Sequence, residues 1–121
     1  MFIQRKSVTI TTDASGDATD YISVDHGRIL SIHYAKTDFA DGVDFTITSE
    51  ATGEGLWTES NVNAAKSVYP RVPVTDQVGG GVTYDGTNEI YEPIAMAGDR
   101  VEIVIAQGGD TKSGTFTVLI G

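Results

Sequence analysis

Residues 43–48 read Val-Asp-Phe-Thr-Ile-Thr, a strict alternation of apolar and polar side chains. Successive side chains of a β-strand point to opposite faces of the sheet, so this pattern predicts a strand with one buried and one solvated face. The same period returns near the C-terminal end, where residues 101–106 read Val-Glu-Ile-Val-Ile-Ala and residues 115–120 read Thr-Phe-Thr-Val-Leu-Ile. A glycine-rich loop at residues 108–114 separates these two segments, and the pair predicts a β-hairpin.

The same pattern extends towards the N-terminus. Alternation predicts strands over residues 2–12 and 18–24, with turn residues between and after them, the second turn being Asp25-His26-Gly27. Residues 28–36 are more apolar and predict a central strand, and residues 89–97 predict a strand that Pro93 interrupts and that a turn at residues 97–99 ends. We therefore expect an all-β chain, a single-domain antiparallel β-sandwich or jelly roll of roughly 7–8 strands.

The middle of the chain, residues 51–81, has little regular period. It holds Pro70 and Pro73, which disfavour a central strand, and it ends in three consecutive glycines. One helical turn is expected over residues 61–66. A long irregular segment in a small domain often has a function, so we interpret this one as an interaction loop.

Composition excludes several classes of function. The chain has 121 residues, 17 of them acidic and 8 basic, with a formal net charge of −9, a sign that repels nucleic acids and anionic membranes. No apolar run approaches the ~20 residues of a membrane helix. Polar residues follow Phe2 and Ile3 directly, so we predict no signal peptide and expect synthesis in the cytoplasm. Cysteine is absent, which excludes disulfides and thiolate chemistry.

The sequence offers no pattern typical of an active site. The two histidines, His26 and His33, have no serine elbow or cysteine to act upon, and the glycine run at residues 79–81 lacks the lysine of a phosphate loop. The aspartates of residues 13–17 and 38–44 could bind calcium, but neither segment has the EF-hand pattern, and both read as ordinary turns. We therefore predict a protein that is not an enzyme and has no cofactor or metal.

Aromatic and arginine side chains dominate protein-binding hot spots, and several lie in or near the irregular middle. The candidate contact residues are Trp57, Tyr69, Arg71 and Tyr84, with Phe2 and Ile3 as a second group at the N-terminal end. Two alternatives stay open. Trp57 is either a contact residue or a part of the domain's own core, and the N-terminal segment is either the first strand or an arm laid onto a neighbour.

Two stretches of the chain are similar to a known family. Residues 54–64, which read Glu-Gly-Leu-Trp-Thr-Glu-Ser-Asn-Val-Asn-Ala, and the following Val-Tyr-Pro-Arg of residues 68–71 resemble phrases in small virion proteins of tailed bacteriophages. Residues 99–116 resemble the same family. The resemblance covers roughly residues 43 to 121 and rests on no catalytic motif.

The resemblance implies a part of the virion, used in many copies. It favours a capsid decoration or cement protein that sits on the capsid surface, binds the major capsid protein and self-associates, as a trimer in this interpretation. A head-to-tail connector or tail component is the first alternative. The second is a carbohydrate-binding β-sandwich, in which Trp57 and Tyr84 would stack on sugar rings.

Overall fold

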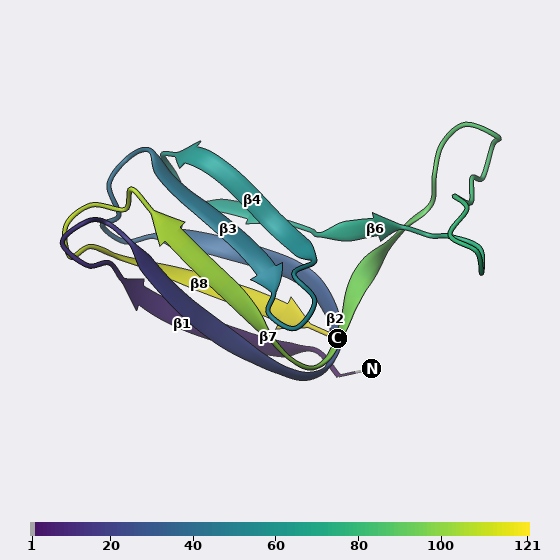
Figure 1. The fold of residues 1–121 in the computed structure, drawn as a ribbon, viewed down its shortest axis with the longest axis horizontal. Coiled ribbons are helices and arrows are strands. Elements are labelled where there is room, and N and C mark those ends of the chain that lie inside the picture. The colour runs from purple at the N-terminus through teal and green to yellow at the C-terminus, as the bar shows by residue number, and fades with distance from the viewer. Residues whose placement is uncertain (1) are drawn as a thin grey trace.

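A computed structural model describes residues 2–121, and these residues form β-strands joined by turns and loops, with no helix among them (Figure 1). The prediction of an all-β chain is thus confirmed. The strands are β1 (Gln4–Thr11), β2 (Ala18–Lys36), β3 (Val43–Ser49), β4 (Gly55–Val62), β5 (Lys66–Val68), β6 (Arg71–Pro73), β7 (Tyr91–Ala106) and β8 (Ser113–Ile120).

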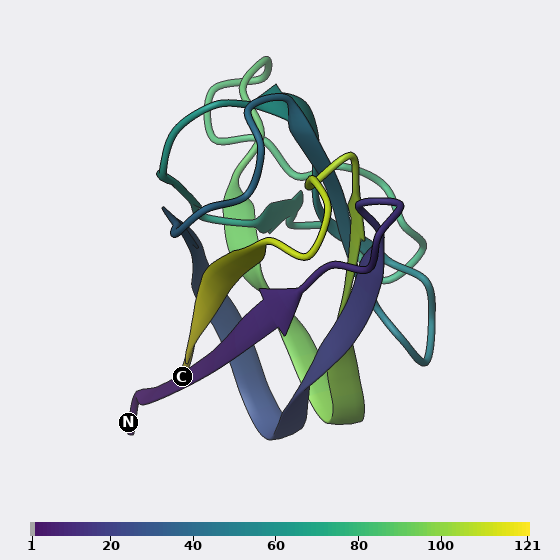
Figure 2. The same cartoon turned by 90° about the vertical axis from the view of Figure 1, so that its left-hand side faces the viewer.

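All the pairings are antiparallel, in the order β1-β8-β2-β7-β3-β4, with β5 on β2 and β6 on β7. Strand β2 belongs to both halves of the sheet. Its first part pairs with β7, from Ala18 opposite Ile105 to Ile29 opposite Ile94, and its second part pairs with β8. The sheet therefore folds over along β2 and β7 into two layers, a sandwich-like arrangement that is visible as two bent ribbons in Figure 2.

The bends correct two of the predicted turns. Residues 25–27 and 97–99 do not end strands, because β2 and β7 continue through them. Gly27 has φ 141°, and a Cβ there would lie 2.6 Å from the side chain of Ile120. Glycine thus lets the strand bend where the opposite layer comes close, without breaking its hydrogen bonds.

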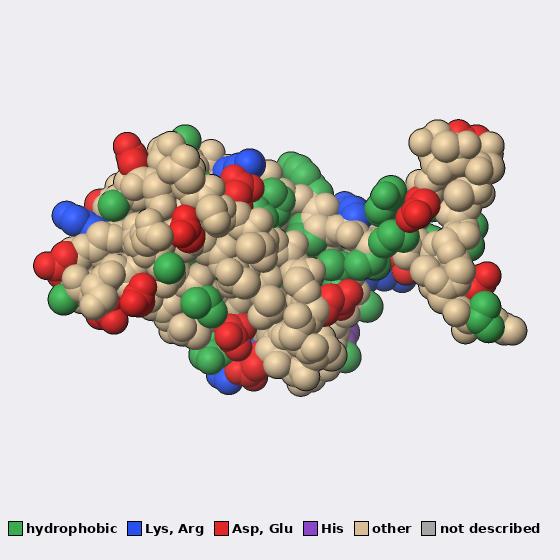
Figure 3. All heavy atoms as spheres, turned by 45° about the horizontal axis from the view of Figure 1, so that its top comes forward, with side chains coloured by type: hydrophobic (Ala, Val, Ile, Leu, Met, Phe, Trp, Pro, Cys, Tyr) green, Lys and Arg blue, Asp and Glu red, His purple; other side chains and the backbone are tan. Residues whose placement is uncertain are grey.

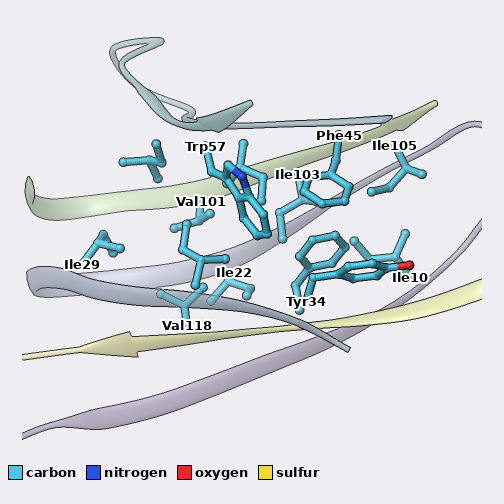
Figure 4. Packing of buried hydrophobic residues seen from close by; sticks show 14 of the residues in the cluster. Ile10, Ile22, Ile29, Tyr34, Phe45, Trp57, Val101, Ile103, Ile105 and Val118 are labelled. Atoms are coloured by element: carbon cyan, nitrogen blue, oxygen red, sulfur yellow. The ribbon is translucent and has the colours of Figure 1, made fainter. Parts of the chain in front are cut away.

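The core lies between the two layers. Tyr34 on β2 and Phe116 on β8 face Phe45 on β3, at ring-centroid distances of 5.3 and 5.2 Å, and Trp57 on β4 meets Phe45 edge-on at 4.7 Å (Figure 4). Branched side chains complete the cluster, among them Ile10, Ile22, Ile29, Ile32, Ile47, Val101, Ile103, Ile105, Val118 and Ile120. On β7 and β8 they occupy alternate positions, as the period of two requires, whereas on β2 a register shift between Ile29 and Ser31 interrupts the alternation.

The expectation of an irregular segment over residues 51–81 is wrong for much of its length. Strands β4, β5 and β6 all lie within it. The pairing of β3 with β4 shifts register twice, which blurs the alternation that would have revealed β4. Asn61 has φ 58° in place of the helical turn expected there.

Candidate protein-binding surfaces

Residues 71–93 project from the sandwich as an arm, which comprises β6, two turns and the start of β7 (Figure 1). None of these residues is buried. Apolar side chains are exposed along it, with Tyr84 at 70% and Val78, Ile90 and Tyr91 also open to solvent. Figure 3 shows the arm standing clear of the sandwich, with hydrophobic side chains at its neck and acidic ones further out.

Backbone hydrogen bonds hold the arm in shape. Beyond the short β6–β7 ladder, the N–H of Val74 donates to the carbonyl of Ile90 at 2.8 Å. The N–H of Val82 donates to Val74 at 3.1 Å, and that of Ile90 donates to Val82 at 3.2 Å, which closes a ring of three. The arm therefore keeps a defined backbone while its side chains remain free to contact a partner.

Two aspartates stabilise the turns of the arm. The Asp76 carboxylate accepts hydrogen bonds from the N–H groups of Val78 and Gly80, at 3.0 and 2.8 Å. Asp85 accepts one from the N–H of Asn88 at 2.6 Å and one from that of Thr87 at 2.9 Å, and these bonds lower the pKa of Asp85. Asp85 is thus fully charged at neutral pH, and the arm presents this negative charge to solvent.

The root of the arm is held by Arg71. Its guanidinium donates to the carbonyl of Leu30 at 3.0 Å and to that of Pro70 at 2.8 Å. Arg71 therefore anchors the arm to β2 of its own chain, which is a different role from the contact residue that the sequence suggested. Tyr69 beside it is exposed and meets the ring of His33 edge-on at 6.5 Å.

Trp57 belongs to the core, so the first of its two interpretations is wrong. Only 7% of its surface is exposed, and its Nε1 donates to Glu59 at 3.0 Å. Glu59 also accepts from Lys66 at 2.6 Å, and that bond is the main reason why the pKa of Glu59 is lowered. An indole packed in this way cannot stack on a sugar ring, which weakens the carbohydrate-binding alternative.

The N-terminal segment supplies a second exposed apolar group. Phe2 is 94% exposed and Ile3 is exposed as well, just before β1 begins at Gln4. Strand β1 is an outer strand of the sheet, paired only with β8, so one of its edges is open to a partner. The residues from Gln4 onwards thus form the first strand, and the arm laid onto a neighbour stays a prediction for Phe2 and Ile3.

A face rich in hydroxyl groups covers the outside of the layer formed by β1 and β8, and the sequence reasoning missed it. Three pairs of side chains hydrogen-bond across the two strands at 2.8–3.1 Å: Ser7 with Thr117, Thr9 with Thr115, and Thr11 with Ser113. The sequence pattern that predicts this face is a serine or threonine at every second position of both strands. Such pairs stabilise the sheet.

The same layer holds a histidine between two serines. His33 Nε2 lies 2.9 Å from the Ser31 hydroxyl, and its Nδ1 lies 2.6 Å from that of Ser67. Since both nitrogens bond hydroxyl groups, no carboxylate orients the ring as in a catalytic triad. The arrangement connects β2 to β5 and explains the position of this histidine.

The aspartates considered for calcium have structural partners. Asp13 accepts from the N–H groups of Ser15 and Asp17, which makes a turn, while Asp41 pairs with Lys36 and Asp44 accepts from the N–H of Asn61. Within residues 2–121, no three His, Cys, Asp or Glu side chains converge as a metal site would need. No helix that could cross a membrane occurs in this part of the chain either.

Comparisons with known proteins add no relative. No protein-family model matches the sequence, and no curated protein is significantly similar to it. The exposed surfaces of the chain are therefore the basis on which its function is inferred.

Proposed function

We propose that this chain is a structural protein of a bacteriophage virion, a capsid decoration protein that stabilises the head and performs no catalysis. The observation that carries the proposal is the arm of residues 71–93. It has a defined backbone, exposes tyrosine, valine and isoleucine side chains, and buries none of its residues within its own chain.

Such an arm is suited to holding a partner. Exposed aromatic and branched side chains gain free energy when a second surface covers them, and a backbone that is already ordered loses little entropy on binding. One small contact of this kind is weak. Repeated over many copies on a lattice, it gives strong overall attachment.

The charge of the chain agrees with a position outside the head. A net charge of −9 repels packed DNA, so a location against the genome would be unfavourable. A location on the outer surface has no such cost. The partner expected there is the major capsid protein.

Quantitative mass spectrometry of purified particles tests the proposal, with the chain counted against the major capsid protein. A decoration protein is expected at on the order of hundreds of copies per particle, because it follows the lattice. About a dozen copies would replace the proposal with a ring at one vertex, the connector or tail alternative. Absence from the particle would contradict it altogether, and binding to a glycan array would then be measured.

A further inference from the structure

Two exposed parts of the chain carry opposite charge. Beyond Arg71, the arm holds four carboxylates and no basic residue: Asp76, Asp85, Glu89 and Glu92. The N-terminal segment, residues 2–12, holds Arg5 and Lys6 and no acidic residue. In a chain with a net charge of −9, the N-terminal segment is thus an unusual cationic stretch.

The positive charge of the segment is available to a partner. Arg5 is exposed and takes part in none of the three ion pairs found among residues 2–121. Lys6 donates to the carbonyl of Ser23 at 2.7 Å, which positions its ammonium group without neutralising it. Among the described residues, no carboxylate of the same chain therefore pairs with these two cations.

The two parts also match in apolar character. The N-terminal segment exposes Phe2 and Ile3, and the arm exposes Val78, Tyr84 and Tyr91. A surface with apolar side chains at its centre and charged ones around them is the usual composition of a protein interface. Each part supplies one half of such a surface.

The arm does not meet the N-terminal segment of its own chain. The arm extends away from the sandwich (Figure 1), and Phe2 would not be 94% exposed if the arm covered it. The complementary surface must then come from another molecule. Strand β1 assists, because its free edge can accept backbone hydrogen bonds from an extended segment.

We infer that the arm of one copy docks onto the N-terminal segment of a second copy of this chain. The inference rests on the proposed function in treating the chain as an assembly part, and it assigns the arm to a second copy, so that the oligomer and not the single chain attaches to the lattice. Each copy offers one arm and one N-terminal segment, which are different surfaces. The contact is therefore head-to-tail, and it closes into a ring when the rotation between neighbours permits.

Charge reversal tests this pairing on the purified chain by sedimentation over a range of concentrations. Arg5→Glu lowers the formal charge of the N-terminal segment from +2 to 0, and Glu89→Lys lowers the negative charge of the arm beyond Arg71 from −4 to −2. Each substitution weakens the attraction and is expected to raise the dissociation constant, by about tenfold for Arg5→Glu. The two substitutions together in one chain leave no opposite charges and should weaken association further. An equimolar mixture of the two single variants should form mixed dimers, because the unchanged arm of the Arg5→Glu chain can meet the unchanged N-terminal segment of the Glu89→Lys chain.

The matched controls lie in the loop between β7 and β8, at the opposite end of the sandwich from the arm. Lys112→Glu and Asp110→Lys change the net charge by the same amounts and should leave the dissociation constant within about twofold of the wild type. Raising the salt concentration should weaken the wild-type association.

Two results would overturn the inference. One is a wild-type chain that stays monomeric at the concentrations reached in assembled particles. The other is an oligomer that Arg5→Glu and Glu89→Lys leave intact, or weaken without rescue when the two single variants are mixed. Neither result contradicts the proposed function if the chain is still found in hundreds of copies per particle. Failure of the pairing and failure of the decoration role can therefore be told apart.

Discussion

Replacing Trp57 by alanine should destabilise the whole fold. Trp57 is only 7% exposed, meets Phe45 edge-on at 4.7 Å and donates a hydrogen bond to Glu59. Truncating a buried aromatic side chain costs about 3–5 kcal/mol, because apolar area is lost and a cavity remains. Small domains have only about 5–15 kcal/mol of total stability, so this loss is a large fraction of it.

Urea unfolding followed by far-ultraviolet circular dichroism measures the loss. Fluorescence would not serve, since Trp57 is the only tryptophan and the variant lacks it. Trp57→Phe is the matched control: it keeps a ring against Phe45 but lacks the hydrogen bond to Glu59, and it should lose less than half as much. A Trp57→Ala loss below about 1 kcal/mol, with an unchanged denaturant slope, would refute the packing described here.

Three further predictions concern the core and the arm. Burial raises the pKa of Tyr34 to about 12, with a smaller contribution from Asp41, and its hydroxyl has no hydrogen-bond partner among the described residues. Tyr34→Phe should therefore stabilise the fold by about 1 kcal/mol at neutral pH, measured by urea unfolding. The pKa of Tyr34 in the folded chain exceeds its unfolded value of about 10, so the free energy of unfolding of the wild type should fall by up to about 3 kcal/mol between pH 10 and 12. The Tyr34→Phe variant should not show this fall, and an equal fall in the variant would contradict the assignment to Tyr34. A Cβ at Gly114 would overlap the Phe39 ring, so Gly114→Ala should lower the free energy of unfolding by about 1–3 kcal/mol. The control is Gly55→Ala, which has no atom near its new Cβ and should change that free energy by less than about 0.5 kcal/mol. Equal effects of the two substitutions would count against the close approach of Gly114 to Phe39. Tyr84→Ser on the arm should leave the melting temperature unchanged, and a clear fall would show that the arm contributes to the fold.

The strands were predictable where one face is buried and the other solvated. Residues 43–48 and 115–118 alternate strictly, and both lie in strands of the structure, β3 and β8. The bend at Gly27 was not predictable, because a glycine beside aspartate and histidine has the composition of a turn. Only the pairing of β2 with two different strands shows that the chain continues through it.

The candidate surfaces were predictable in part. Tyr84 and Phe2 are exposed, as contact residues must be, while Trp57 is buried and Arg71 binds carbonyl groups of its own chain. Residue type alone does not separate these cases, since a large aromatic side chain suits a core as well as an interface. The projection of the arm is a property of the folded backbone, and no local pattern in the sequence indicates it.

Attachment to phage particles, which the proposed function requires, is the decisive property of the arm. Phage particles carrying the double variant Val78→Ser/Tyr84→Ser would be purified, and the copies retained would be counted by mass spectrometry. Val104→Ser is the matched control, because Val104 is an exposed apolar residue of β7 outside the arm. We expect the arm variant to be largely lost from the particles while the control is retained at the wild-type number. Equal retention of both variants would contradict it.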